Sequence, residues 1–122
     1  MSDIEYLDLE DLLGMVRALK VGPVMEVGLL DSAVARARSS TFGEDAYPTL
    51  SLKAAALLHS LTNNHGLVDG NRRLAWLATV VLLDLNGKRP NVSDAEAFGL
   101  VWEIAASSID VPAIGQRLQV TD

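Results

Sequence analysis

Two apolar segments with the spacing of amphipathic helices flank a short polar stretch, residues 65–73, in the middle of the chain. The segment before it, LKAAALLHSLTNN, is so rich in alanine and leucine that almost no polar face remains. The segment after it, at about residues 71–86, carries an apolar stripe formed by Leu74, Leu77, Ala78, Val81, Leu82 and Leu85. This periodicity predicts two helices, of which the first is largely buried. We expect this central pair to organise the fold.

Further helices are expected before the central pair. The first spans about residues 8–20, with Asp8 as its N-terminal cap, and the turn formers VGPV end it. A second begins at about Asp31. Its apolar face consists of Leu30, Ala33, Val34 and Ala37. Ser51 is expected to cap the first helix of the central pair.

Turn and cap signals define the remaining elements. TFGEDAYPTL at residues 41–50 contains several turn formers and predicts a loop or a short hairpin, a flap that is either a docking place for a protein substrate or an ordinary surface loop. Gly87 is expected to end the second central helix. SDAE at residues 93–96 has the spacing of a capping box and predicts another helix. A last helix begins near Asp110, with Pro112 in its first turn.

Composition points to an all-α fold. Aromatic residues make up 5% of the 122 residues and the apolar fraction is 49%, so leucine, valine and alanine must form the core. No repeat or linker divides the chain. The sequence therefore predicts one domain, residues 1–122, built as a helical bundle of about six helices with a short flap or hairpin.

Several classes of function are excluded or disfavoured. The absence of cysteine excludes disulfides, thiolate catalysis and zinc–thiolate sites. A net charge of −6 argues against direct nucleic-acid binding, which needs clustered lysine and arginine. The longest apolar run ends at Asp84 and is too short to span a membrane, and the acidic N-terminal segment does not resemble a secretory signal. We expect a cytoplasmic protein without a membrane partner.

The basic residues of the polar stretch favour an anion site. The first turn of a helix exposes unpaired backbone N–H groups and the positive end of the helix dipole. Arg72 and Arg73 lie in such a turn, where a cation is unfavourable by about 0.3–1 kcal/mol. An arginine pair there is explained by a bound polyanion, because guanidinium groups match phosphate oxygens. No Walker loop, dinucleotide fingerprint or nucleophile elbow is present.

The neighbouring residues each allow a structural and a functional interpretation. Asp69 either caps the second central helix or binds Mg²⁺, which is normally held by one or two carboxylates together with substrate phosphates. Asn71 either donates to a phosphate oxygen or closes the turn. Gly70 provides either a close approach to phosphate or a positive φ. His65 is either a surface group or the proton acceptor of the stretch, whereas His59 is interpreted as a core histidine.

The stretch HGLVDGNRR resembles the core motif of the Fic/Doc superfamily, and specifically its Doc branch, the toxins of Phd/Doc toxin–antitoxin modules. The residues that fit the Doc pattern are His65, Leu67, Asp69, Gly70, Asn71, Arg72 and Arg73. Arg72 stands where Fic proteins have glycine, and Trp76 stands where they have a second arginine. Flanking segments, including VGLLDSAVARARSS and LDLNGKR, extend the resemblance over about residues 5–118.

The resemblance implies an all-helical Fic fold that binds ATP with Mg²⁺. By position, His65 and Asp69 would be catalytic, with His65 the general base and Asp69 the Mg²⁺ ligand. Gly70, Asn71, Arg72 and Arg73 would bind the phosphates of the nucleotide. Fic enzymes transfer AMP to a protein hydroxyl, whereas Doc toxins transfer the γ-phosphate to a translation elongation factor and arrest bacterial growth. The bulk of Arg72 favours phosphorylation over adenylylation.

The same resemblance implies a partner, a Phd-like antitoxin whose C-terminal segment folds into a helix in an apolar groove. Two departures from the family pattern bear on activity. Leu67 replaces a phenylalanine that anchors the motif loop, and Arg72 replaces a more frequent lysine. A catalytically weak antitoxin-binding module is therefore a third hypothesis, beside the kinase and the AMP transferase.

Overall fold

The computed structural model describes residues 3–122, and within them it contains six α-helices and one short hairpin. The expected all-α fold with a hairpin is therefore confirmed. The elements are α1 (Leu9–Leu19), α2 (Val27–Ala37), β1 (Ser40–Thr41), β2 (Glu44–Asp45), α3 (Leu50–Asn64), α4 (Asn71–Leu85), α5 (Asp94–Ala105) and α6 (Val111–Arg117). None of these helices, between residues 3 and 122, has the length and apolar character needed to cross a bilayer.

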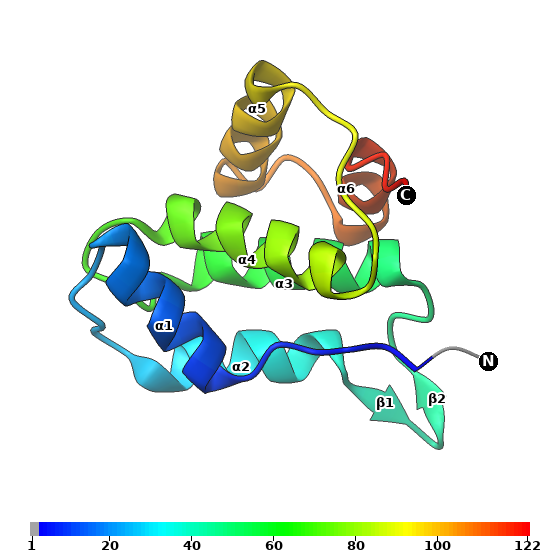
Figure 1. Ribbon diagram of the computed structural model, residues 1–122, viewed down its shortest axis with the longest axis horizontal. Helices are drawn as coiled ribbons and strands as arrows, with labels where there is room; N and C mark the ends of the chain where they lie inside the picture. Colours follow the sequence, from blue (N-terminus) through cyan, green and yellow to red (C-terminus); the bar gives the residue numbers. More distant parts are fainter. Residues whose placement is uncertain (1–2) are drawn as a thin grey trace.

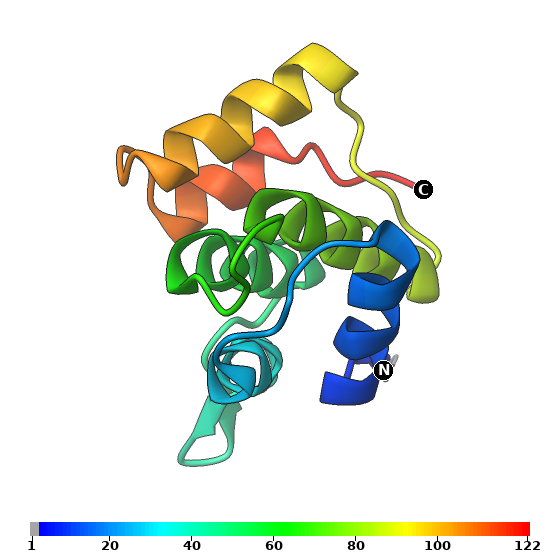
Figure 2. The same cartoon turned by 90° about the vertical axis from the view of Figure 1, so that its left-hand side faces the viewer.

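The helices are arranged in three layers with the expected central pair in the middle. Figures 1 and 2 show α1 and α2 on one side of α3 and α4, and α5 and α6 on the other side. Helix α3 packs against α2, α4, α5 and α6. Its alanines allow this close approach from several directions, and Ala54, Ala55 and Ala56 are all fully buried. The core is accordingly made of alanine, leucine and valine with no fully buried aromatic ring among the described residues.

Most predicted helix starts are confirmed by the cap geometry. Asp8 caps α1 and exchanges hydrogen bonds with Asp11, and Ser93 caps α5 in the same way with Glu96. Asp110 accepts a hydrogen bond from a backbone N–H in the first turn of α6. Each cap satisfies donors that the helix itself leaves unpaired and contributes about 1 kcal/mol.

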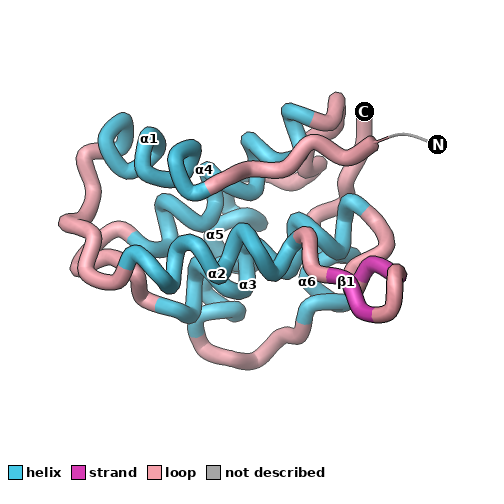
Figure 3. The backbone as a smooth tube through the Cα atoms, turned by 90° about the horizontal axis from the view of Figure 1, so that it is seen from below, coloured by secondary structure: helices cyan, strands magenta, loops and turns pink. Residues whose placement is uncertain are grey.

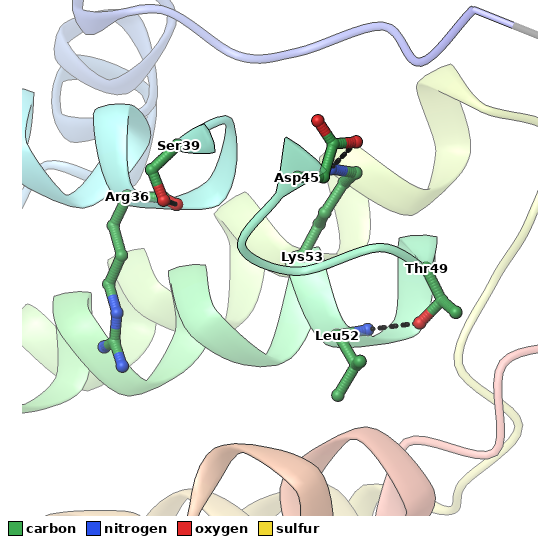
Figure 4. Close-up of polar contacts among 6 residues, drawn as sticks. All are labelled: Arg36, Ser39, Asp45, Thr49, Leu52 and Lys53. Atoms are coloured by element: carbon green, nitrogen blue, oxygen red, sulfur yellow. Dashed lines mark hydrogen bonds and ion pairs between the residues drawn. The ribbon is translucent and has the colours of Figure 1, made fainter. Parts of the chain in front are cut away.

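Two predicted helix starts are wrong. Helix α2 begins at Val27, four residues before Asp31, because the backbone N–H of Glu26 donates to Gly66 O at 3.0 Å and fixes the preceding turn. This partner lies forty residues away, so local sequence does not reveal it. Helix α3 is capped by Thr49 rather than Ser51, because the Thr49 hydroxyl accepts from the Leu52 N–H (Figure 4).

The β1–β2 hairpin lies at the far end of the central pair from the polar stretch. Lys53 on α3 is almost fully buried and forms an ion pair of 3.0 Å with Asp45, which ties the hairpin to the start of α3 (Figure 4). Figures 1 and 3 show the hairpin at the opposite end of the molecule from the loop that joins α1 to α2. The fifteen residues of α3 separate it from His65 by about 22 Å. The structure therefore does not bring the expected flap beside the motif.

A half-buried polar network joins α2 to α3. Arg36 donates to the Tyr47 hydroxyl at 2.8 Å and to Ser60 Oγ at 2.9 Å, and it lies 3.0 Å from His59 Nδ1. Because arginine can only donate, His59 Nδ1 must accept, and its ring proton is on Nε2. Burial and the charge of Arg36 lower the pKa of His59 below 6.5. His59 is thus a half-buried histidine with a satisfied ring nitrogen, and not the fully buried core residue that the sequence predicted.

This lowered pKa predicts that acid destabilises the fold. The unfolded chain binds a proton at His59 near pH 6.5, whereas the folded chain does not until the pH is lower. The free energy of unfolding should therefore fall as the pH drops from 7.5 through 6.5 towards the folded-state pKa. Urea unfolding at pH 7.5 and 5.5 measures this loss. His59→Gln keeps an acceptor for Arg36 and should show a smaller loss; an equal loss in both proteins would contradict the assignment.

Candidate functional site

The loop of residues 65–70 joins α3 to α4 and presents His65 to solvent. His65 ends α3 in the left-handed conformation, with φ 54° and ψ 49°, and its side chain is exposed. Two residues later, Leu67 is 1% exposed and belongs to the core. Leu67 therefore anchors the loop in the core. The family resemblance implies the same role for the larger phenylalanine that Leu67 replaces.

A segment that sequence analysis treated as a helix breaker supports this loop from behind. Residues 21–26 run beside it, and three of their backbone hydrogen bonds hold it. Gly22 N donates to Asp69 O at 2.9 Å, Met25 N donates to Gly66 O at 2.8 Å, and Val68 N donates to Pro23 O at 3.0 Å. The loop is thus held along its length by backbone contacts, whose partners no sequence pattern identifies.

Asn71 and Gly70 set the conformation of the loop where α4 begins. The Asn71 side chain accepts from Leu67 N at 3.0 Å and donates to Leu67 O at 2.9 Å, so it closes the turn. One amide hydrogen of Asn71 is left to face a ligand. Gly70 has φ +91°, and a Cβ there would lie 2.4 Å from Val21 Cβ. A glycine is therefore required at position 70, both by the positive φ and by the close packing on Val21.

Asp69 does not cap α4, so the structural interpretation of this residue is wrong. The N-cap of α4 is Gly70, and no side chain makes a cap hydrogen bond there. The Asp69 carboxylate is exposed and forms no ion pair within residues 3–122. The Asp69 carboxylate is therefore free to bind a cation through its oxygens. The backbone N–H groups at the start of α4, which no side chain caps, are free to bind an anion.

The two arginines lie at the start of α4 and are both exposed. The Arg72 guanidinium lies 4.8 Å from the centre of the Trp102 ring, and Arg73 Nη2 donates to Leu19 O at 3.3 Å. Neither forms an ion pair with a carboxylate in the described part of the chain. Their charges are therefore not neutralised by the protein itself, which favours binding of an anion.

One polar cavity of about 330 Å³ gathers all of the predicted site residues. Its wall is formed by Thr62, His65, Val68, Asp69, Gly70, Asn71, Arg72, Arg73 and Ala105. The size falls within the range of small-ligand sites. Thr62, Val68 and Ala105 were not among the predicted site residues; Thr62 and Ala105 come from the last turns of α3 and α5. No sequence signal distinguishes them from neighbours that face the core.

A second, larger cavity of about 620 Å³ adjoins the first and is mainly apolar. It lies between α4 and α5, and its wall includes Leu19, Arg72, Arg73, Trp76, Leu77, Val80, Asp94, Ala97, Phe98, Val101 and Trp102. The two arginines line both cavities. The polar cavity and the apolar groove therefore share one wall, at the start of α4.

Two comparisons with known proteins find similar sequences. A family model described as the Fic/DOC family matches residues 6–83, which include the whole loop and most of α4. A curated protein named Toxin Doc, from Mycolicibacterium smegmatis, is 44% identical over 118 residues. That alignment covers 93% of this chain and 91% of the relative.

Proposed function

The chain belongs to the Fic/DOC family, and on that premise we propose that it is the toxin of a bacterial toxin–antitoxin module. We propose further that it transfers the γ-phosphate of ATP to a hydroxyl group of a translation elongation factor and so arrests growth. One observation carries the proposal: a single cavity is lined by an exposed imidazole, an unpaired carboxylate and two arginines at an uncapped helix start. These groups are the ones that phosphoryl transfer requires.

In this reaction His65 acts as the general base. Its imidazole accepts the proton of the acceptor hydroxyl as the hydroxyl oxygen attacks the γ-phosphorus. The bond between that phosphorus and the bridging oxygen breaks, and ADP leaves with the bond electrons. Arg72, Arg73 and the N–H groups of α4 stabilise the negative charge on the phosphate oxygens. The backbone hydrogen bonds between residues 21–26 and the loop fix the position of the loop backbone between His65 and the start of α4.

Asp69 would be the protein ligand of Mg²⁺, which would balance the charge of the triphosphate. The described residues contain no cluster of three histidine, aspartate or glutamate side chains that would enclose a cation. Mg²⁺ does not need such a cluster, because it usually keeps several waters and binds one or two carboxylates together with substrate phosphates. A single exposed carboxylate beside the anion site fits this mode of binding.

Transfer of the γ-phosphate is preferred over transfer of AMP because of Arg72. Fic proteins have glycine at this position, and a long cation in its place occupies space beside the start of α4. The stack on Trp102 keeps the Arg72 side chain next to the polar cavity. A nucleotide bound in the Fic orientation would have less room there for its α-phosphate, so AMP transfer is the second candidate.

Labelled ATP distinguishes the two reactions. The purified chain is incubated with a bacterial elongation factor, Mg²⁺ and ATP labelled at either the α- or the γ-phosphate. We expect the γ-label, and not the α-label, to become bound to the elongation factor. Transfer of the α-label would instead establish an AMP transferase, and transfer of neither label would favour a binding module without catalysis.

The apolar groove between α4 and α5 is proposed as the binding place of a Phd-like antitoxin segment. Phe98 and Trp102 are 71% and 55% exposed and stack on each other at 6.0 Å, so they offer a large apolar surface. An amphipathic helix typically binds in such a groove through its apolar face. Because the groove shares Arg72 and Arg73 with the polar cavity, a segment bound there would lie beside the nucleotide.

Leu77→Glu is expected to weaken antitoxin binding about tenfold or more, because it places a carboxylate in the apolar groove. Leu77 lines the groove and is not part of the buried core, so the fold should persist. Calorimetry with the C-terminal peptide of the antitoxin encoded beside this chain measures the effect. Glu10→Gln on α1, whose exposed side chain lies outside the groove, is the control and should bind as the native chain does. Equal affinity of Leu77→Glu and the native chain would place the antitoxin elsewhere.

A further inference from the structure

We propose that Trp102 is a positioning residue of the phosphate site, holding the Arg72 guanidinium so that its N–H donors face the polar cavity. This inference rests on the proposed function, since it assigns a role in binding the nucleotide. Trp102 itself does not line the polar cavity and is not expected to touch the nucleotide. It acts through Arg72, from a different helix and thirty residues further along the chain.

The geometry around Arg72 supports this assignment. The guanidinium carbon lies 4.8 Å from the centre of the Trp102 ring, a distance typical of a cation–π contact. Phe98 precedes Trp102 by four residues on α5, and its ring is nearly parallel to that of Trp102, at an interplanar angle of 10°. Since Arg72 forms no ion pair with a carboxylate between residues 3 and 122, the aromatic ring is its main side-chain partner.

Stacking and phosphate binding are compatible in one guanidinium group. Its five N–H donors lie in the plane of the group, so a ring packed against the face of the group leaves them free. A stacked arginine therefore keeps its donors available for phosphate while losing much of its rotamer freedom. Without the ring, an exposed arginine must lose that freedom when the ligand binds, which weakens binding.

Within residues 3–122, Trp102 is not a member of the buried core. Helix α5 packs on the core through Leu100, Val101 and Ile104, which are buried, whereas Trp102 is 55% exposed. Because more than half of Trp102 is exposed, its replacement should cost less stability than the replacement of a fully buried residue of α5. Its replacement should therefore change ligand binding more than stability, and this separates a positioning role from a structural one.

The test compares Trp102→Leu and Trp102→Phe in the full chain, with binding of ATP and Mg²⁺ measured by calorimetry. Trp102→Leu retains an apolar side chain but has no aromatic face, and it should weaken ATP binding about threefold to fivefold. Trp102→Phe should restore most of the affinity. Phe42→Leu removes an exposed ring from the β1–β2 hairpin, at the other end of α3 from Arg72, and it is expected to change the affinity less than twofold.

A double-mutant cycle shows whether the effect passes through Arg72. Arg72→Ala alone should weaken ATP binding by roughly tenfold or more, and adding Trp102→Leu should then change it less than twofold. Where turnover is measured, Trp102→Leu should raise KM and leave kcat nearly unchanged. Native affinity in Trp102→Leu, or an equal loss with and without Arg72, would overturn the inference alone. Failure of the native chain to bind ATP would overturn the proposed function as well.

Discussion

Replacing His65 with alanine is expected to lower the rate of phosphoryl transfer about 10²- to 10⁴-fold, the usual contribution of a general base. The imidazole is exposed at the end of α3 and lines the polar cavity, so its removal leaves the core intact. Transfer of γ-label to the elongation factor measures the rate. Growth of bacteria in which the chain is induced gives a second readout, because the variant should no longer arrest growth.

The matched control for this prediction is His59→Gln. His59 lies on the same helix, two turns earlier, and bonds to Arg36 outside the polar cavity, so this variant should keep its activity. A second variant, His65→Asn, tests the fold, because asparagine tolerates the left-handed conformation that residue 65 adopts. Growth arrest by an abundant, folded His65→Ala protein would contradict the kinase and the AMP transferase together and favour the binding module.

Gly70→Ala is expected to destabilise the fold by about 3–5 kcal/mol, a large part of the stability of a typical domain. The added Cβ would lie 2.4 Å from Val21 Cβ, and the backbone would have to keep a φ of +91°. Val21 cannot easily move, because its N–H donates to Val16 O and the next residue bonds to Asp69. Urea unfolding of the native and variant chains measures the loss.

Gly87→Ala separates the two causes of this loss. Gly87 follows α4 with φ +73°, but nothing lies within 4 Å of a Cβ added there. This variant therefore carries the conformational cost without the steric one and should lose about 1–2 kcal/mol. Equal losses at the two positions would show that close packing on Val21 does not contribute.

Those elements whose signals are local could be predicted from the sequence. The cap at Asp8, the capping box at Ser93 and the end of the second central helix near Gly87 depend on residues within one turn of each other, and the structure has all three. The apolar periodicity also identified the central pair of helices. The start of α2 was missed because a backbone contact with Gly66 determines it, and such contacts carry no side-chain signature.

In the polar stretch, too, local features could be predicted from the sequence and contacts between distant segments could not. All six predicted residues line one cavity, because five of them follow one another along the chain and the sixth is four residues away. The structure excludes the interpretation of Asp69 as the cap of α4. It supports the interpretation of Asn71 as the residue that closes the turn. The contact between Trp102 and Arg72 could not be predicted from the sequence, because it joins two distant segments.

The sequence by itself determined the helical architecture and the cluster of polar groups at residues 65–73, since both depend on neighbours along the chain. Tertiary structure alone decided what supports that cluster: the backbone of residues 21–26 behind the loop, and the aromatic pair of α5 beside Arg72. It also decided that the hairpin lies at the other end of α3. The physical reason is that packing between distant segments depends on shape and on backbone hydrogen bonds, which are not encoded in any local pattern of residue types.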